Sequence, residues 1–154
     1  AIAAKAVCLK EAAEPSFAAY QRQVAANARR LAAALDREKF RLVSGGTDTH
    51  LIVVDVLSRG LTGRQAEDAL GRAGITVNKN AIPFDTKPPF VASGIRVGTP
   101  AVTTRGMRET DMEVIGQMIG RVLAAPDDAS VAETVRAEVQ ALCQTFPLHP
   151  TDSR

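Results

Sequence analysis

The chain has 154 residues, 45% of them hydrophobic, which is enough for one domain with a hydrophobic core. Its net charge is only +2 and no run of lysines or arginines forms a basic patch, so the composition argues against a nucleic-acid partner. No segment is apolar and long enough to cross a membrane, and an alanine-rich start that carries Lys5, Lys10 and Glu11 is not typical of a signal peptide.

Two helices are predicted at the start of the chain. Residues 2–13 follow a helical pattern that opens without a Ser, Thr, Asp or Asn cap, so we expect the chain to be cut from something longer. Pro15 suits the first turn of a second helix, because its fixed φ is helical and its missing N–H is not needed there. Apolar residues of that helix are spaced three or four apart and predict one buried stripe. The stripe consists of Phe17, Tyr20, Val24, Ala28, Leu31 and Leu35.

Two strands and a short helix follow. Residues 40–44 (FRLVS) predict a short strand, and residues 51–56 (LIVVDV) predict a strand that is apolar on both faces and therefore central in its sheet. Thr62 and Gln65 have the spacing of a capping box, which opens the helix. Gly74 is expected to be its C-cap, since glycine readily adopts a left-handed backbone.

The second half of the chain predicts two more strands and two more helices. The strands are expected at residues 75–78 and 94–98, and Pro100 is expected to end the latter because proline cannot donate to a sheet. Thr110, with the glutamate three residues later, suggests a capping box for a long helix. Asp128 suits the N-cap of the last helix. The order of elements predicts an α+β two-layer sandwich, with a small, mainly antiparallel sheet and helices on one face.

The two cysteines, Cys8 and Cys143, lie near opposite ends of the chain. No CxxC motif or Cys/His spacing is present, so we expect no metal site. Lone cysteines of this kind are typical of free thiols in a reducing compartment, which favours a cytoplasmic protein. His50 has no Cys, Asp or Glu at ligand spacing and is interpreted as a structural residue.

The most informative segment spans residues 78–106 and reads NKNAIPFDTKPPFVASGIRVGTPAVTTRG. It holds four of the eight prolines of the chain, several glycines, and one arginine inside an apolar strand. Prolines make an irregular backbone rigid, and glycines allow positive φ and close approach. A rigid irregular backbone beside a lone charge is typical of a binding surface.

Arg96 is the charge in that strand. Because strand side chains alternate, Ile95 and Val97 share the core face and Arg96 is expected to point away from the core. A guanidinium matches a carboxylate with two parallel hydrogen bonds, so one interpretation is a carboxylate anchor. The alternative is a structural ion pair with Asp55 or Asp85.

Asn78 and Asn80 flank Lys79 at the start of the same segment. An asparagine offers both a donor and an acceptor, which suits the edge of a heterocycle. Composition alone favours the alternative, in which the two asparagines serve turn chemistry. Lys79 is not interpreted as a Schiff-base lysine, because a turn between two asparagines neither desolvates it nor places it beside another cation.

Three motifs resemble the C-terminal region of the serine hydroxymethyltransferase family, and the resemblance covers residues 1–147. The motifs are SGGTDTHLIVVDV (44–56), LTGRQAEDALGRAGITVNKNAIPFD (61–85) and PPFVASGIRVGTPAVTTRG (88–106). The resemblance implies the α+β small domain of the aspartate-aminotransferase-like enzymes that use pyridoxal phosphate. Under it, residues 1–14 form a helix at the junction with a missing large domain, residues 15–147 form the small domain, and residues 148–154 form a loose tail.

The resemblance also implies roles for individual residues. Arg96 corresponds to the arginine that binds the carboxylate of serine or glycine, and Asn80 to the asparagine that hydrogen-bonds the folate pteridine. Pro88, Pro89 and Phe90 fall on the loop that borders the folate site. The family interconverts serine and glycine and moves a one-carbon unit to tetrahydrofolate, and its pyridoxal phosphate stabilises the carbanion.

One departure from the family concerns catalysis. The lysine that carries pyridoxal phosphate in the family follows a histidine in a Thr-rich run, and no lysine of this chain has that context. We therefore expect no catalytic residue here: the chain is expected to be an inactive fragment of a transferase whose parent is a homodimer or larger. The alternative is a stand-alone, non-catalytic module that binds folate or carboxylates or serves an interaction.

Overall fold

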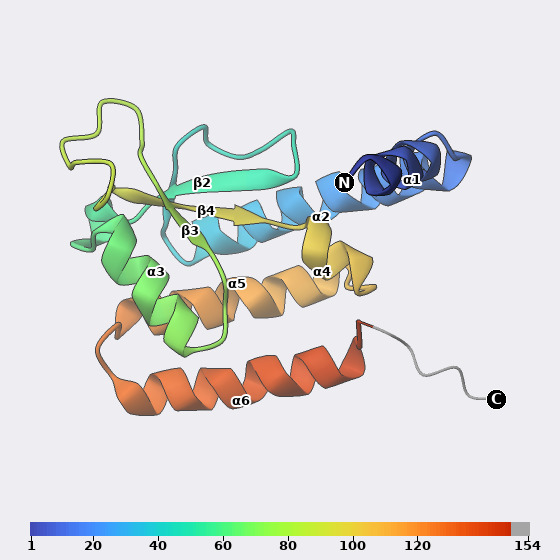
Figure 1. The fold of residues 1–154 in the computed structure, drawn as a ribbon. Coiled ribbons are helices and arrows are strands. Elements are labelled where there is room, and N and C mark those ends of the chain that lie inside the picture. Colours follow the sequence, from blue (N-terminus) through green and yellow to red (C-terminus); the bar gives the residue numbers. More distant parts are fainter. Residues whose placement is uncertain (149–154) are drawn as a thin grey trace.

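The structure is a computed structural model that describes residues 1–148 (Figure 1). The described residues form α-helices, one short 3-10 helix and four strands. In order these are α1 (Ile2–Ala12), α2 (Pro15–Arg37), β1 (Arg41–Leu42), β2 (Leu51–Asp55), η1 (Leu57–Arg59), α3 (Gly63–Arg72), β3 (Asn78–Asn80), β4 (Gly94–Gly98), α4 (Pro100–Thr104), α5 (Glu109–Ala124) and α6 (Ala129–Thr145).

The four strands form one antiparallel sheet in the order β1-β2-β4-β3. Figure 1 shows α2, α3, α5 and α6 on one side of this sheet, with α6 beyond α5. The strand residues that face the helices are buried: Leu42, Ile52, Val54, Ile95 and Val97. The predicted α+β fold with helices on one face is therefore confirmed, and the opposite face of the sheet is left open by these helices.

Local sequence signals account for several of the helix ends. The Thr62 hydroxyl accepts from the amide of Gln65 (3.2 Å), and the Gln65 side chain accepts from the amide of Thr62 (2.9 Å), so the predicted capping box of α3 is confirmed. The Asp128 carboxylate accepts from the amide of Ser130 (2.9 Å) at the start of α6. Pro15 occupies the first turn of α2, as predicted.

The predicted stripe of α2 is only partly buried. Its four later members, Val24, Ala28, Leu31 and Leu35, all lie in the core. Phe17 is exposed, and Tyr20 is half-buried with its hydroxyl 3.1 Å from the carbonyl oxygen of Pro100.

The predicted strand 75–78 is wrong. The strand that forms is β3, at Asn78–Asn80, and residues 75–77 carry the chain from α3 to the sheet. The C-cap of α3 is Ala73, and Gly74 follows it with a φ of +80°, which turns the chain back so that the amide of Ile75 reaches the carbonyl of Leu70 (2.9 Å). Apolar residues that fill the core beside a helix end have the same short pattern as a buried strand.

Two further boundaries differ from the sequence-based expectation, whereas β4 ends before Pro100 as predicted. The strand predicted at 40–44 is reduced to Arg41–Leu42. Pro100 not only follows β4 but also starts α4, because proline is as well suited to the first helical position as to a strand end. The capping box expected at Thr110 does not form: α5 begins at Glu109, and the Asp111 carboxylate accepts from the amide of Arg108 (2.7 Å). Of the tail predicted at 148–154, residues 149–154 lie outside the described residues.

Candidate functional site

Arg96 lies near the middle of the open face of the sheet. Its side chain is exposed while Ile95 and Val97 on either side are buried, so the predicted orientation away from the core is confirmed. In the register of the sheet, Arg96 pairs with Val53 on β2 and with Asn78 on β3. Directly paired residues share a face, so the guanidinium and the Asn78 side chain emerge side by side.

Asn80 joins them from the same strand. Residues two apart along a strand share a face, which places Asn80 with Asn78 and Arg96 on the open side. The interpretation of these asparagines as turn residues is wrong, because both lie in β3 and pair with β4. The side-chain amide of Asn80 donates to the carbonyl of Ala81 (2.6 Å), which leaves its side-chain oxygen as an acceptor.

Neither proposed ion pair of Arg96 forms. Asp55 pairs with Arg41 instead, with 2.6 Å between Nη1 and Oδ2. The carboxylate of Asp85 is occupied by groups of its own loop, among them the amide and hydroxyl of Ser93. Within residues 1–148, no acidic side chain forms a salt bridge with Arg96. The guanidinium is thus available to an anionic ligand on the open face.

The loop of residues 81–93 connects β3 to β4 and lies at the end of the sheet where Asn80 pairs with Gly94. Gly94 permits this arrangement: a Cβ there would lie 2.7 Å from the side chain of Ile82 and 2.8 Å from the carbonyl oxygen of Val54. Pro88, Pro89 and Phe90 are all exposed on this loop. The structure therefore places the three predicted folate-loop residues on the connection between the strands that carry Asn80 and Arg96.

Asp85 organises this loop. Its carboxylate accepts from the amides of Lys87 (2.8 Å), Ser93 (2.9 Å) and Ile82 (3.2 Å), and from the Ser93 hydroxyl (2.5 Å). Ser93 is fully buried, and its carbonyl accepts from the amide of Val56 (3.1 Å), so the loop is tied to the chain just after β2. This role of Asp85 was not predicted from the sequence, which suggested Asp85 only as a partner of Arg96.

Part of the loop is held in an unfavourable backbone conformation. Phe84 and Ala92 have φ values of 59° and 56°, in the left-handed region that residues with a Cβ rarely adopt. Such strain persists only where surrounding contacts enforce it, and it is concentrated at binding and switch sites. The hydrogen bonds to Asp85 span the stretch between these two residues and are suited to enforce it.

We expect the order of this loop to depend on the charge of Asp85. The Ser93 hydroxyl, with the amides of Lys87 and Ile82, holds the pKa of Asp85 at about 2, below the usual 3.8. Because the pKa is lowered in the folded state, the stabilisation is fully present above pH 3.8 and is lost as the pH falls through about 2. An NMR titration of the Asp85 carboxyl carbon should show a midpoint near 2, together with a shift of the Ser93 amide.

The variant Asp85→Asn is the control for that titration, since it removes the ionisable group and should leave the Ser93 amide without this transition. A midpoint for Asp85 close to 3.8 would contradict the hydrogen-bonded arrangement of the loop.

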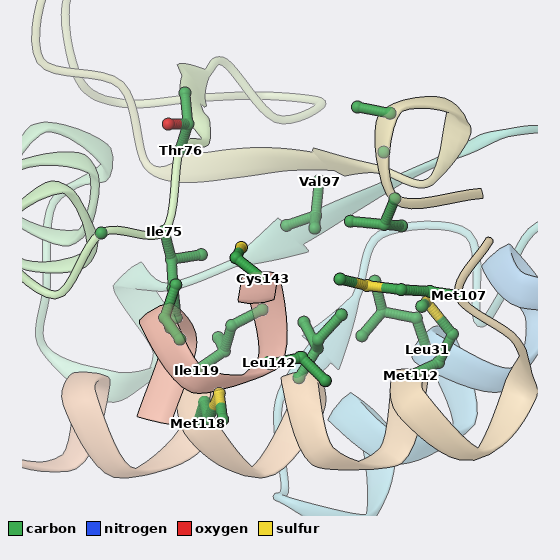
Figure 2. A pocket seen from close by; sticks show the side chains of 16 residues that line it. Leu31, Ile75, Thr76, Val97, Met107, Met112, Met118, Ile119, Leu142 and Cys143 are labelled. Carbon is green, nitrogen blue, oxygen red and sulfur yellow. The ribbon is translucent and has the colours of Figure 1, made fainter. Parts of the chain in front are cut away.

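An apolar cavity of about 230 Å³ lies on the other side of the sheet. Figure 2 shows Val97 of β4 pointing into it, toward Met107, Met112 and Leu31. Since Val97 and Arg96 lie on opposite faces of the same strand, this cavity belongs to the core side and is not the predicted site. Arg96 and Asn80, which are predicted to bind ligands, lie instead on the open face of the sheet, and the loop of residues 81–93 lies at one end of that face.

The remaining candidates stay structural. His50 is exposed and precedes β2, and its carbonyl accepts from the amide of Thr99 (3.0 Å). Cys8 and Cys143 are free thiols, as predicted. Among residues 1–148, no group of three or more His, Cys, Asp or Glu side chains could hold a metal ion. The described helices also include none that is long and apolar enough to span a bilayer.

Comparison with known proteins identifies similar sequences. The family model "Serine hydroxymethyltransferase" matches residues 1–119. The serine hydroxymethyltransferase of Myxococcus xanthus is 58% identical over 149 residues, which cover 96% of this chain and 35% of the relative. The enzymes of that name from Koribacter versatilis (56% identical, 97% of this chain and 35% of the relative) and Desulforapulum autotrophicum (55%, 99% and 36%) are similar. The chain thus spans little more than a third of the length of these curated relatives.

Proposed function

Because the chain belongs to the serine hydroxymethyltransferase family, we propose that it supplies one wall of the active site of an enzyme that interconverts serine and glycine. In this proposal the enzyme transfers the one-carbon unit to tetrahydrofolate and uses pyridoxal phosphate, which stabilises the carbanion at the substrate Cα. Two free thiols support a location in the cytoplasm.

The observation that carries the proposal is the position of Arg96. It is exposed on the open face of the sheet, beside Asn78, and makes no salt bridge within the part of the chain that the structure describes. A guanidinium in this position binds the carboxylate of glycine or serine with two parallel hydrogen bonds and so fixes the orientation of the Cα bonds. The role of Arg96 is therefore to bind and orient the substrate.

Asn80 and the neighbouring loop support a folate site. The side-chain oxygen of Asn80 is suited to accept a hydrogen bond from a pteridine N–H. Pro88, Pro89 and Phe90 offer exposed apolar surface at the same end of the sheet, where a flat heterocycle can pack. Asp85 keeps this loop in place.

The lysines of this chain do not fit covalent attachment of pyridoxal phosphate. The Lys79 ammonium forms an ion pair with the carboxylate of Glu67 (3.0 Å) and has no neighbouring cation in that contact. The other four, Lys5, Lys10, Lys39 and Lys87, are exposed. A Schiff-base lysine needs desolvation or a neighbouring cation, so no chemical step is assigned to this chain. We propose that the attachment lysine lies in the part of the enzyme that the chain does not span.

The proposed partners follow from the same geometry. The open face of the sheet is suited to dock on a large domain that carries the cofactor, and the proposed enzyme is a homodimer or larger. The 35% coverage of the relatives supports a missing large domain. In this proposal the isolated chain is inactive.

The test is a trapping experiment on the chain alone. The chain is mixed with pyridoxal phosphate and glycine, reduced with borohydride and weighed by mass spectrometry. We expect no stoichiometric adduct, because no lysine here is activated. An adduct on a single lysine would overturn this division of roles. A calorimetric titration of this chain with glycine and a reduced folate tests the alternative, a stand-alone binding module. Tight binding of both ligands would favour that alternative.

A further inference from the structure

We propose that Glu67 of α3 is a positioning residue for the folate side of the site, because it holds the strand that carries Asn80. This inference rests on the proposed function and deepens it. Glu67 lies outside the segment of residues 78–106 that carries the predicted binding residues. Its side chain reaches that segment through Lys79.

The contact is a two-point clamp on one residue. Oε1 of Glu67 accepts from the backbone amide of Lys79 (3.1 Å), and Oε2 accepts from the Lys79 ammonium (3.0 Å). One carboxylate therefore fixes both the backbone and the side chain of the same strand residue. Charge-assisted hydrogen bonds of this kind are stronger than those between neutral groups.

The strand that is clamped is a weak one. β3 has three residues, Asn78–Asn80, and lies at the edge of the sheet, where it pairs with β4 alone. An edge strand presents unpaired amides on its outer side, and the amide of Lys79 would be one of them without Glu67. The carboxylate thus replaces the missing neighbouring strand.

The clamp acts on the binding residues through the alternation of side chains. Lys79 pairs with the buried Ile95 and belongs to the helix side of β3, whereas Asn78 and Asn80 belong to the open side. Fixing the middle residue of a three-residue strand fixes the positions of both neighbours. Glu67 therefore positions two potential ligand groups without touching the ligand.

The helix that carries Glu67 is itself firmly placed. Its start is closed by the capping box of Thr62 and Gln65, and Gly63 packs so closely that a Cβ there would collide with the carbonyl oxygen of Gly94. The amide of Gly63 also donates to the carbonyl of Ala92 (2.9 Å). α3 is thus a rigid support for the end of the sheet at which the loop lies.

Arg96 does not depend on this support to the same degree. It lies in β4, which pairs with β2 on one side and with β3 on the other. Loss of the clamp should therefore affect the two ligands differently. The affinity for folate, which depends on Asn80, should fall, whereas the affinity for the substrate carboxylate, which depends on Arg96, should be retained.

The experiment measures both affinities in the pyridoxal-phosphate-loaded enzyme that contains this chain. Glu67→Ala is expected to raise the Kd for a reduced folate by on the order of 10-fold, because a small misplacement of a binding group is costly. The Kd for glycine should change by less than about twofold under the same principle. Glu67→Gln keeps an acceptor for the Lys79 amide and should restore most of the folate affinity.

The matched control is Glu138→Ala, which removes another glutamate from an ion pair, with Arg121 between α5 and α6. It should change neither affinity. An unchanged folate affinity in Glu67→Ala would overturn the inference. Equal losses of folate and glycine binding would do the same, since they would indicate a general structural role.

A wild-type enzyme that binds neither ligand would contradict the proposed function instead, and amide exchange in this chain would then decide the inference. Glu67→Ala should speed exchange at the Lys79 amide and leave the Thr99 amide unchanged, since that amide lies just after β4 and donates to the His50 carbonyl (3.0 Å), on the side away from β3. Unaltered exchange at Lys79 would overturn the clamp.

Discussion

Replacing Arg96 by lysine is expected to weaken the binding of glycine and serine by roughly 10- to 100-fold, because a hydrogen bond to a charged group contributes about 1.5–3 kcal/mol and lysine cannot form the paired contact. Arg96→Ala, which also removes the charge, should cost more, on the order of 3 kcal/mol or above. Calorimetric titration of the holoenzyme with glycine measures both effects. The fold should be unaffected, since the Arg96 side chain is exposed.

Arg121→Lys is the matched control, because Arg121 forms an exposed ion pair with Glu138 on the helix side of the domain. Exposed pairs contribute little, so this variant should bind glycine like the wild type. If Arg96→Lys also bound glycine with unchanged affinity, Arg96 would have no role as the carboxylate anchor.

Gly94→Ala is expected to lower the free energy of unfolding by roughly 3 kcal/mol, at the upper end of the usual cost of overpacking. The added Cβ would lie 2.7 Å from the Ile82 side chain, 2.8 Å from the Val54 carbonyl oxygen and 3.0 Å from the Asn80 carbonyl oxygen. Two of these neighbours are backbone atoms of paired strands, which cannot rotate away. The midpoint of urea unfolding should fall with an unchanged m-value.

Gly98→Ala provides the comparison within the same strand and on the same face. A Cβ at Gly98 would lie 3.5 Å from the nearest atom, the carbonyl oxygen of His50, which is an ordinary van der Waals distance. This variant should unfold near the wild-type midpoint. Equal midpoints for Gly94→Ala and Gly98→Ala would contradict the close packing of the loop onto the sheet.

The parts of the fold that the sequence predicted are those specified by local signals. The start of α3 follows from the Thr62 and Gln65 box, and β4 follows from an apolar run between two glycines, Gly94 and Gly98. The orientation of Arg96 required only the alternation of side chains along a strand. Each of these signals lies within a few residues of the feature that it determines.

The predictions failed where contacts between residues far apart in the sequence determine the local structure. β3 forms at Asn78–Asn80 because these residues pair with Arg96, Ile95 and Gly94, and nothing local distinguishes them from a turn. Likewise, the partners of Asp85 and Glu67 become neighbours only after the loop and α3 have folded onto the sheet. The sequence thus suggested which residues to propose for binding, whereas the residues that hold them in place became visible only in the fold.

The order of the strands has a consequence for synthesis on the ribosome. β4 is the last of the four strands to be made, yet it lies between β2 and β3. Until residue 98 has emerged, β2 can pair within this sheet only with the two-residue β1, and β3 has no strand to pair with. From the synthesis of β2 until β4 has emerged, the nascent domain therefore exposes unpaired strand edges, a state that is prone to aggregate and that chaperones protect. The strand that carries Arg96 is also the one that ends this exposure.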